Sequence, residues 1–134
     1  MTQLAPDEAT ATRKDDVVVL VVPADGSYLA VLRTATAGLA ARLQFTLDEI
    51  EDLRIAVDEA SAMLLAVAVG SAELTCQFEV TPAALTIEVG VPVPGTAALP
   101  GNQSFSWQVL TALAGEVVAD TAPGRVAIRL VGTA

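Results

Sequence analysis

The sequence contains no histidine and a single cysteine, Cys76. Without histidine the chain cannot assemble a Ser–His–Asp triad, a Cys–His dyad or a zinc site. A lone cysteine also cannot form a disulfide within the chain. Cys76 alternates with the apolar residues Leu74, Phe78 and Val80, and this alternation favours a small core residue over a reactive thiol.

Basic residues are also scarce. Seven Lys and Arg residues stand against 16 Asp and Glu residues, so the net charge is −9 and the sequence pI is about 4.2. Binding to nucleic acid or to an anionic membrane needs clusters of basic side chains, and their absence disfavours both partners. An acidic chain of this kind is either soluble on its own account or complementary to a basic protein partner.

Long hydrophobic runs are missing as well. Although 53% of the residues are apolar, no uncharged apolar run is long enough to span a bilayer. Residues 1–16 read MTQLAPDEATATRKDD, which lacks the apolar centre of a signal peptide, and we therefore expect a cytoplasmic protein. The length of 134 residues fits an N-terminal tail over residues 1–14 and one domain over residues 15–134.

Hydrophobic periodicity predicts the element order β-α-α-β-β-α-β-β. The expected elements are a strand at 16–22, helices at 28–43 and 46–69, strands at 74–80 and 85–89, a helix at 104–114, and strands at 116–119 and 125–131. The first strand is a continuous β-branched run, which is typical of a strand covered on both faces or at the sheet centre. A mostly antiparallel sheet of about five strands must cover one face with the three helices, so the fold class is α+β, a two-layer α/β sandwich.

The helix expected at 46–69 is the most informative stretch. Thr46 and Glu49 form a capping-box pattern at its start. An apolar stripe then follows at steps of three and four: Leu47, Ile50, Leu53, Val57, Ala60, Leu64 and Val67. Glu59 and Met63 lie one position off this stripe, one turn apart. A carboxylate beside a core face costs desolvation energy unless it has a partner or a task.

Three further features leave alternatives open. The acidic residues of the 46–69 helix form either a partner surface or a solvated face on which Arg54 pairs with Glu51 or Asp58. Phe105 and Trp107 are favoured as core residues, and either becomes an interface anchor if it is exposed. Residues 91–102 form a Pro- and Gly-rich loop whose length is usual for function or for disorder.

Residues 49–65, EIEDLRIAVDEASAMLL, resemble the N-box helix of the anti-sigma-factor and serine-protein-kinase family, part of the histidine-kinase-like ATPase superfamily (GHKL, or Bergerat fold). Family members read close to E-D-L-x-x-A-V-x-E-A-x-x-N here. Residues 104–118, SFSWQVLTALAGEVV, are similar to the family's last helix, particularly in actinobacterial stress-response anti-sigma factors. The resemblance covers residues 16–131, and the predicted element order is also the family's order.

The chain departs from this family at three nucleotide-handling features. Glu59 matches the family's catalytic base, but Met63 replaces the asparagine that holds Mg²⁺, and a thioether is a poor ligand for that ion. The aspartate that reads adenine is missing from residues 90–100. The phosphate turn is reduced to Gly101 and the segment up to Ser104, with no basic residue. The joint loss predicts a fold kept without ATP chemistry, and thus no cofactor.

The resemblance implies an anti-sigma-factor-like regulator that sequesters an alternative sigma factor and is released by an anti-anti-sigma factor. Candidate partner-binding residues are Asp48, Glu51, Asp52 and Asp58. The resemblance also implies a homodimer, as family members form. Leu29, Leu32 and Leu39 of this chain either contribute to such a contact or are simply core residues. Two alternatives remain open. One is an active serine kinase that uses ATP, Mg²⁺ and Glu59 to phosphorylate an anti-anti-sigma factor, and the other is a non-enzymatic sensing domain with a repurposed apolar pocket.

Overall fold

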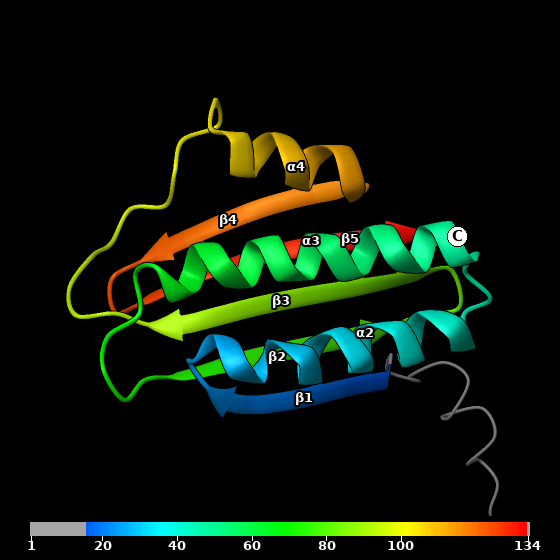
Figure 1. Ribbon diagram of the computed structural model, residues 1–134, viewed down its shortest axis with the longest axis horizontal. Coiled ribbons are helices and arrows are strands. Elements are labelled where there is room, and N and C mark those ends of the chain that lie inside the picture. The colour runs from blue at the N-terminus through cyan, green and yellow to red at the C-terminus, as the bar shows by residue number, and fades with distance from the viewer. Residues whose placement is uncertain (1–15, 134) are drawn as a thin grey trace, which may run out of the picture.

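The computed structural model describes residues 16–133, which form a five-stranded sheet with three helices on one face (Figure 1). The elements are β1 (Asp16–Pro23), the 3₁₀ turn η1 (Gly26–Tyr28), α2 (Leu29–Arg42), α3 (Leu47–Leu65), β2 (Glu73–Val80), β3 (Ala84–Pro92), α4 (Phe105–Leu113), β4 (Glu116–Ala122) and β5 (Arg125–Thr133). The strand order is β1-β2-β3-β5-β4, and every neighbouring pair is antiparallel. The predicted α+β two-layer sandwich is therefore confirmed, whereas the expected tail at residues 1–14 lies outside the described residues.

The first strand is not where its composition predicts. Among the described residues, β1 is an edge strand whose one pairing partner is β2, and Val17, Val19 and Val21 are about half exposed on the sheet face opposite the described helices. The prediction of a central or doubly covered strand is wrong. A run of β-branched residues specifies an extended backbone, but the neighbours that a strand finds are decided by the rest of the sheet.

Alternation along the inner strands builds the core. Every second residue of β2, β3 and β5 points at the helix layer, and these residues are fully buried except Val80 at the end of β2, as at Phe78, Ile87 and Ile128. Helix α3 packs across β3 and β5 and lies between α2 and α4 (Figure 1). No helix in the described part of the chain is long and apolar enough to cross a membrane.

Helix α3 begins as its sequence predicts. Thr46 Oγ1 accepts a hydrogen bond from the Glu49 backbone N–H at 3.1 Å, and Glu49 Oε1 accepts one from the Thr46 backbone N–H at 2.7 Å. This capping box satisfies two N–H groups that have no partner within the helix. The apolar stripe is correct at its centre and wrong at its start, because Leu47 is 84% exposed. The helix ends at Leu65, four residues before the predicted end, and the chain turns through Gly70, whose φ is +33°.

Residues 93–100 connect β3 to the turn before α4 and pack against the protein. Val93 is buried, and its N–H donates to the Gly124 carbonyl at 3.0 Å. The Gly124 N–H in turn donates to the Gly95 carbonyl at 2.7 Å. Ala97 and Leu99 contact the hydrophobic core. The Pro- and Gly-rich stretch is thus fastened to the β4–β5 turn at one end and to the core further along.

Two glycines allow a direct test of how closely α3 packs on the sheet. A Cβ atom at Gly132 would lie 2.7 Å from Leu53 Cδ1, whereas a Cβ at Gly38 of α2 would meet nothing within 4 Å. Gly132→Ala is expected to lower the free energy of unfolding by about 1–3 kcal/mol through overpacking. Gly38→Ala should raise it by about 0.5–1 kcal/mol, because alanine favours the helix. Urea denaturation of both variants measures this, and equal stability of Gly132→Ala and the parent would contradict the packing.

Candidate functional site

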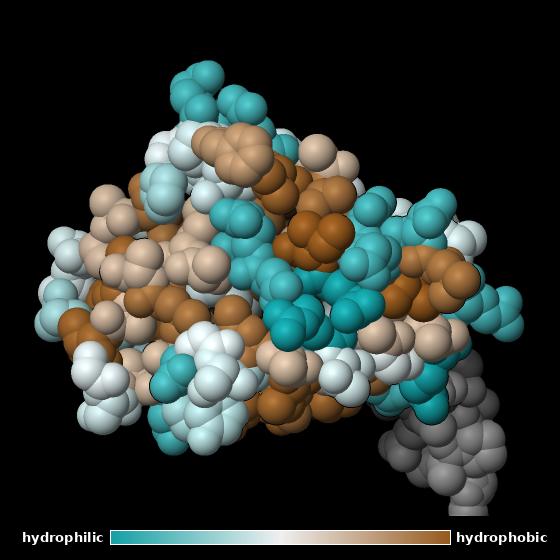
Figure 2. Space-filling view, viewed as in Figure 1, coloured by the Kyte–Doolittle hydropathy of each residue, from teal (hydrophilic) through white to brown (hydrophobic). Residues whose placement is uncertain are grey.

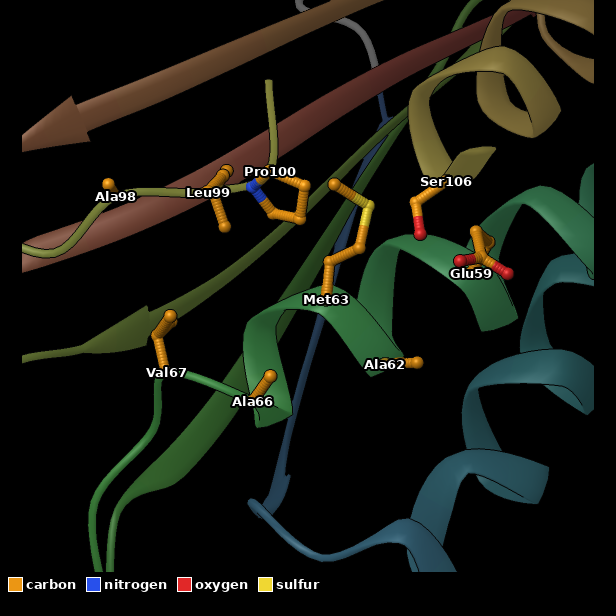
Figure 3. Close-up of a pocket in the computed structure, with 9 residues that line it drawn as sticks. All are labelled: Glu59, Ala62, Met63, Ala66, Val67, Ala98, Leu99, Pro100 and Ser106. Carbon is orange, nitrogen blue, oxygen red and sulfur yellow. The ribbon is translucent and has the colours of Figure 1, made fainter. Parts of the chain in front are cut away.

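A groove of about 480 Å³ lies between the C-terminal half of α3, residues 98–100 and the first turn of α4 (Figure 3). The residues that line it are Glu59, Ala62, Met63, Ala66, Val67, Ala98, Leu99, Pro100 and Ser106. Figure 2 shows this face of the molecule. Hydrophilic surface covers the middle of α3, and apolar or weakly polar surface extends over the end of the helix, where the groove lies.

Helix α3 provides one wall of the groove through its spacing. Residues 59, 62, 63 and 66 follow the i, i+3, i+4, i+7 pattern, so they share one face. Met63 is buried and forms the apolar base of this wall, whereas Ala62 and Ala66 are exposed. Because alanine side chains are short, the groove stays open along the last two turns of the helix.

The opposite wall is held in place by the only tryptophan. Trp107 is buried, and its indole Nε1–H donates to the Pro100 carbonyl. The turn before α4 is further fixed because Ser104 Oγ accepts from the Trp107 backbone N–H at 3.3 Å and the Ser104 N–H donates to the Gly101 carbonyl at 2.9 Å. Gly101 and Ser104 therefore shape this turn, and neither lines the groove. The side chain that this segment contributes is that of Ser106.

Polar groups gather at one end of the groove. Figure 3 shows the Glu59 carboxylate and the Ser106 hydroxyl at this end, with Val67 and Leu99 toward the other. Glu59 is half-buried. Within residues 16–133, three ion pairs form and none includes Glu59. The carboxylate thus faces an open apolar groove without a cation beside it.

These groups do not fit ATP and Mg²⁺. The lining residues include no Lys, Arg or Asn, although a triphosphate requires cationic or N–H donors and Mg²⁺ requires several oxygen ligands. The Met63 thioether stands where the resemblance places a metal-binding amide. Within the described residues, no three His, Cys, Asp or Glu side chains cluster closely enough to hold a metal ion.

The four candidate partner-binding acids divide into two pairs. Glu51 is bound to Arg54 at 2.9 Å, which selects one of the two pairings expected for that arginine. Asp58 instead accepts from Arg33 of α2, with both carboxylate oxygens within 3.0 Å of Nη1. Asp48 and Asp52 are exposed and take part in no ion pair among residues 16–133. Of the four candidate residues, Asp48 and Asp52 are therefore the two whose charge no ion pair within residues 16–133 compensates.

The two aromatic residues at the start of α4 separate. Trp107 is a core residue, as predicted, but Phe105 is 78% exposed, so its assignment to the core is wrong. Phe105 and Trp107 are two residues apart in α4, so they lie on opposite faces of the helix, and the face of Trp107 is the one that packs on the core. Cys76 is fully buried, and burial raises the pKa of its thiol to about 12. Its interpretation as a core residue is confirmed.

Several groove residues cannot be found from the sequence pattern used above. Ala62 and Ala66 lie on the same helical face as Glu59, so their spacing from Glu59 could have identified them. The predicted apolar stripe instead follows the larger residues of the helix. Ala98, Leu99 and Pro100 lie in a loop, where no periodicity predicts which side chain faces α3. Ser106 looks like any polar residue of a first helical turn.

Comparison with known proteins gives partial matches. No protein-family model matches the chain. A 45-residue segment is 47% identical to serine-protein kinase RsbW of Bacillus subtilis strain 168 and 42% identical to RsbW of Bacillus velezensis, and a 43-residue segment is 42% identical to RsbW of Bacillus thuringiensis strain Al Hakam. These segments are 32–34% of this chain and 27–28% of each relative. The chain therefore matches about a quarter of the length of these relatives. Together with the α+β sandwich, the matches support a relationship to the RsbW-type, GHKL-like kinases.

The composition of the groove leads to a prediction about nucleotide. We expect millimolar ATP with Mg²⁺ to leave the melting temperature of the chain unchanged, because the groove offers no cationic side chain to the phosphates and only one carboxylate to the metal. A ligand at a hundred times its Kd would stabilise the folded state by about 2.7 kcal/mol. Differential scanning fluorimetry measures the shift, with RsbW of Bacillus subtilis as the positive control. Saturable stabilisation by ATP–Mg²⁺ would contradict the prediction.

Proposed function

We propose that this chain is an anti-sigma-factor-like regulator that binds and sequesters an alternative sigma factor. An anti-anti-sigma factor would release the sigma factor by competing for the regulator, and the exchange would take place in the cytoplasm. The observation that supports this proposal is the combination of an N-box-like helix in a GHKL-like sandwich with a groove whose lining includes no Lys or Arg and a single carboxylate, that of Glu59. The regulatory part of the family's function requires a protein surface, whereas its kinase activity requires nucleotide.

The surface of α3 supports a protein partner of basic character. Asp48, Asp52 and Ile55 follow each other at helical spacing on the outer face of α3, and Ile55 is 42% exposed. Phe105 adds an exposed aromatic ring at the start of the neighbouring helix α4. Apolar side chains surrounded by charge are typical of protein–protein interfaces, in which the charges steer association. Sigma-factor surfaces that contact DNA are basic, so they suit this acidic helix face.

The serine-kinase alternative is less well supported. Glu59 would have to act as a general base beside a Mg²⁺ ion that Met63 cannot ligate. The matched relatives are themselves named serine-protein kinases, but the matched segment spans little more than a quarter of their length. We therefore assign this chain the regulatory role without phosphoryl transfer.

We also propose that the chain forms a homodimer through β1. Within residues 16–133, one side of this edge strand has no pairing partner and Val17, Val19 and Val21 are exposed, and an unprotected apolar edge is a ready site for pairing with another strand. Two of the three leucines named for the alternative contact do not support it. Leu32 is fully buried and Leu39 packs against the core, so both stabilise the fold of one chain, whereas Leu29 is half-buried and is not part of the core.

Charge reversal on α3 tests the partner surface. The purified chain is titrated against each alternative sigma factor of its native host by biolayer interferometry. Binding to one of them is expected, with an association rate that falls as salt increases. The double variant Asp48→Lys/Asp52→Lys should slow association by about tenfold or more, since rim charges act mainly on the encounter rate.

The matched control is Glu79→Lys/Glu116→Lys, which makes the same change in net charge on strands β2 and β4, at exposed positions of the sheet. It should bind nearly as fast as the parent chain. Equal slowing by both double variants would show an effect of net charge alone and contradict the assignment to α3. If no sigma factor of the host binds, the proposed function is wrong.

Substitution in β1 tests the dimer. Val19→Lys places a charge in the middle of the edge strand and should shift the chain from dimer to monomer in sedimentation equilibrium at micromolar concentration. Val118→Lys is the control, because Val118 is a similarly exposed valine on β4, the strand at the opposite edge. A parent chain that is monomeric, or a dimer that Val118→Lys disrupts and Val19→Lys does not, would contradict this interface.

A further inference from the structure

We propose that the groove beside Glu59 binds a small organic cation, with an ammonium or guanidinium group carried on an apolar chain or ring. This inference goes beyond the regulatory function proposed above and does not depend on the identity of the protein partner. It assigns the chain a ligand of the opposite charge to a nucleotide.

The polar end of the groove determines the charge of the ligand. A carboxylate can only accept hydrogen bonds, and Glu59 forms no ion pair with any residue from 16 to 133. No lining residue is basic, so an anionic ligand would meet a carboxylate of its own sign. A ligand that brings N–H donors and positive charge would satisfy Glu59, and the Ser106 hydroxyl at the same end offers a further acceptor (Figure 3).

The remainder of the groove determines the body of the ligand. Ala62, Met63 and Ala66 form one apolar wall, and Leu99 and Pro100 form the other. Each methylene group buried between such walls is expected to tighten binding by roughly threefold to fourfold. The flexible, polarisable Met63 side chain adapts to chains and rings alike. A volume of about 480 Å³ lies in the range of sites for small molecules.

Residues 99 and 100, which form the loop side of the groove, are held in place without a ligand. The hydrogen bond from Trp107 to the Pro100 carbonyl and the packing of Leu99 against the core fix residues 99 and 100. A wall that is already ordered loses little conformational entropy on binding, which favours a small ligand with few contacts. Because Trp107 is the only tryptophan and is bonded to a lining residue, its fluorescence reports directly on the groove.

The test uses two probes of similar size and opposite charge, 2-phenylethylammonium and 3-phenylpropanoate, followed by n-butyl- and n-hexylammonium. Binding is followed through Trp107 fluorescence and the methyl NMR signals of Met63, Ala62 and Ala66. The cation is expected to cause saturable shifts with a Kd of millimolar order or tighter, and the anion none. The hexyl compound should bind about tenfold more tightly than the butyl compound, by two methylene groups.

Two variants locate the site. Glu59→Gln keeps the shape of the side chain, removes its charge and should abolish the preference for the cation. Ala66→Leu narrows the groove and should weaken the binding of hexylammonium at least fivefold while Glu59 remains. Glu79→Gln, on β2, removes an equal charge on another element and should bind as the parent chain does. Unchanged melting temperatures of the variants show that they fold.

Three results would overturn the proposal. The first is equal signal shifts with the cation and the anion, and the second is no saturable shift with any cation up to roughly 20 millimolar, a concentration at which only very weak binding remains undetected. The third is binding of the cation by Glu59→Gln as tight as by the parent chain. In a separate titration with the sigma factor, a groove whose signals respond to that protein and to no small cation would instead be a protein-docking surface. Because the cation assay itself contains no sigma factor, its failure leaves the proposed regulatory function standing, and loss of sigma binding leaves the cation site standing.

Discussion

The packing of α3 on the sheet is the constraint on which the rest of the structure depends. Leu53 fits against Gly132 so closely that a single methyl group would not find room. Fully buried residues continue this contact along the helix at Val57, Ala60 and Leu64. With the helix rotation set by these residues, the side chains one position away, including Glu59 and Met63, are turned to the same flank, where the loop before α4 meets them. The core of the protein therefore determines what the groove can contain.

Charged and apolar surface lie at opposite ends of helix α3. The first half of α3 carries exposed aspartates, and its last two turns carry alanines and Met63. Ion pairs compensate Glu51 and Asp58 within the described residues, so Asp48, Asp52 and Glu59 keep their charge available. A basic macromolecule suits the first half, and a small cation suits the second. Both proposed roles rest on the same deficit of basic side chains, and both differ from that of a site built for an anionic nucleotide.

Local patterns predicted a large part of this fold. The capping box at Thr46, the alternation around Phe78 and the turn at residues 123–124 appear in the structure as expected, because each depends on neighbours within a few residues. The failures concern residues whose surroundings come from distant parts of the chain. Val17, Val19 and Val21 of β1, Leu47 and Phe105 are apolar by type, yet they lie at a sheet edge or a helix start that no other element among residues 16–133 covers.

The sequence by itself determined the α+β class and the order of the elements, because these depend on periodicity and on residue chemistry. Only the tertiary structure decided that Ser106 and the 98–100 loop face Glu59, that Arg33 and not Arg54 pairs with Asp58, and that Ser104 serves the turn. These are contacts between elements far apart in the chain. Their geometry is set by how the helices pack on the sheet, and no local pattern encodes that packing.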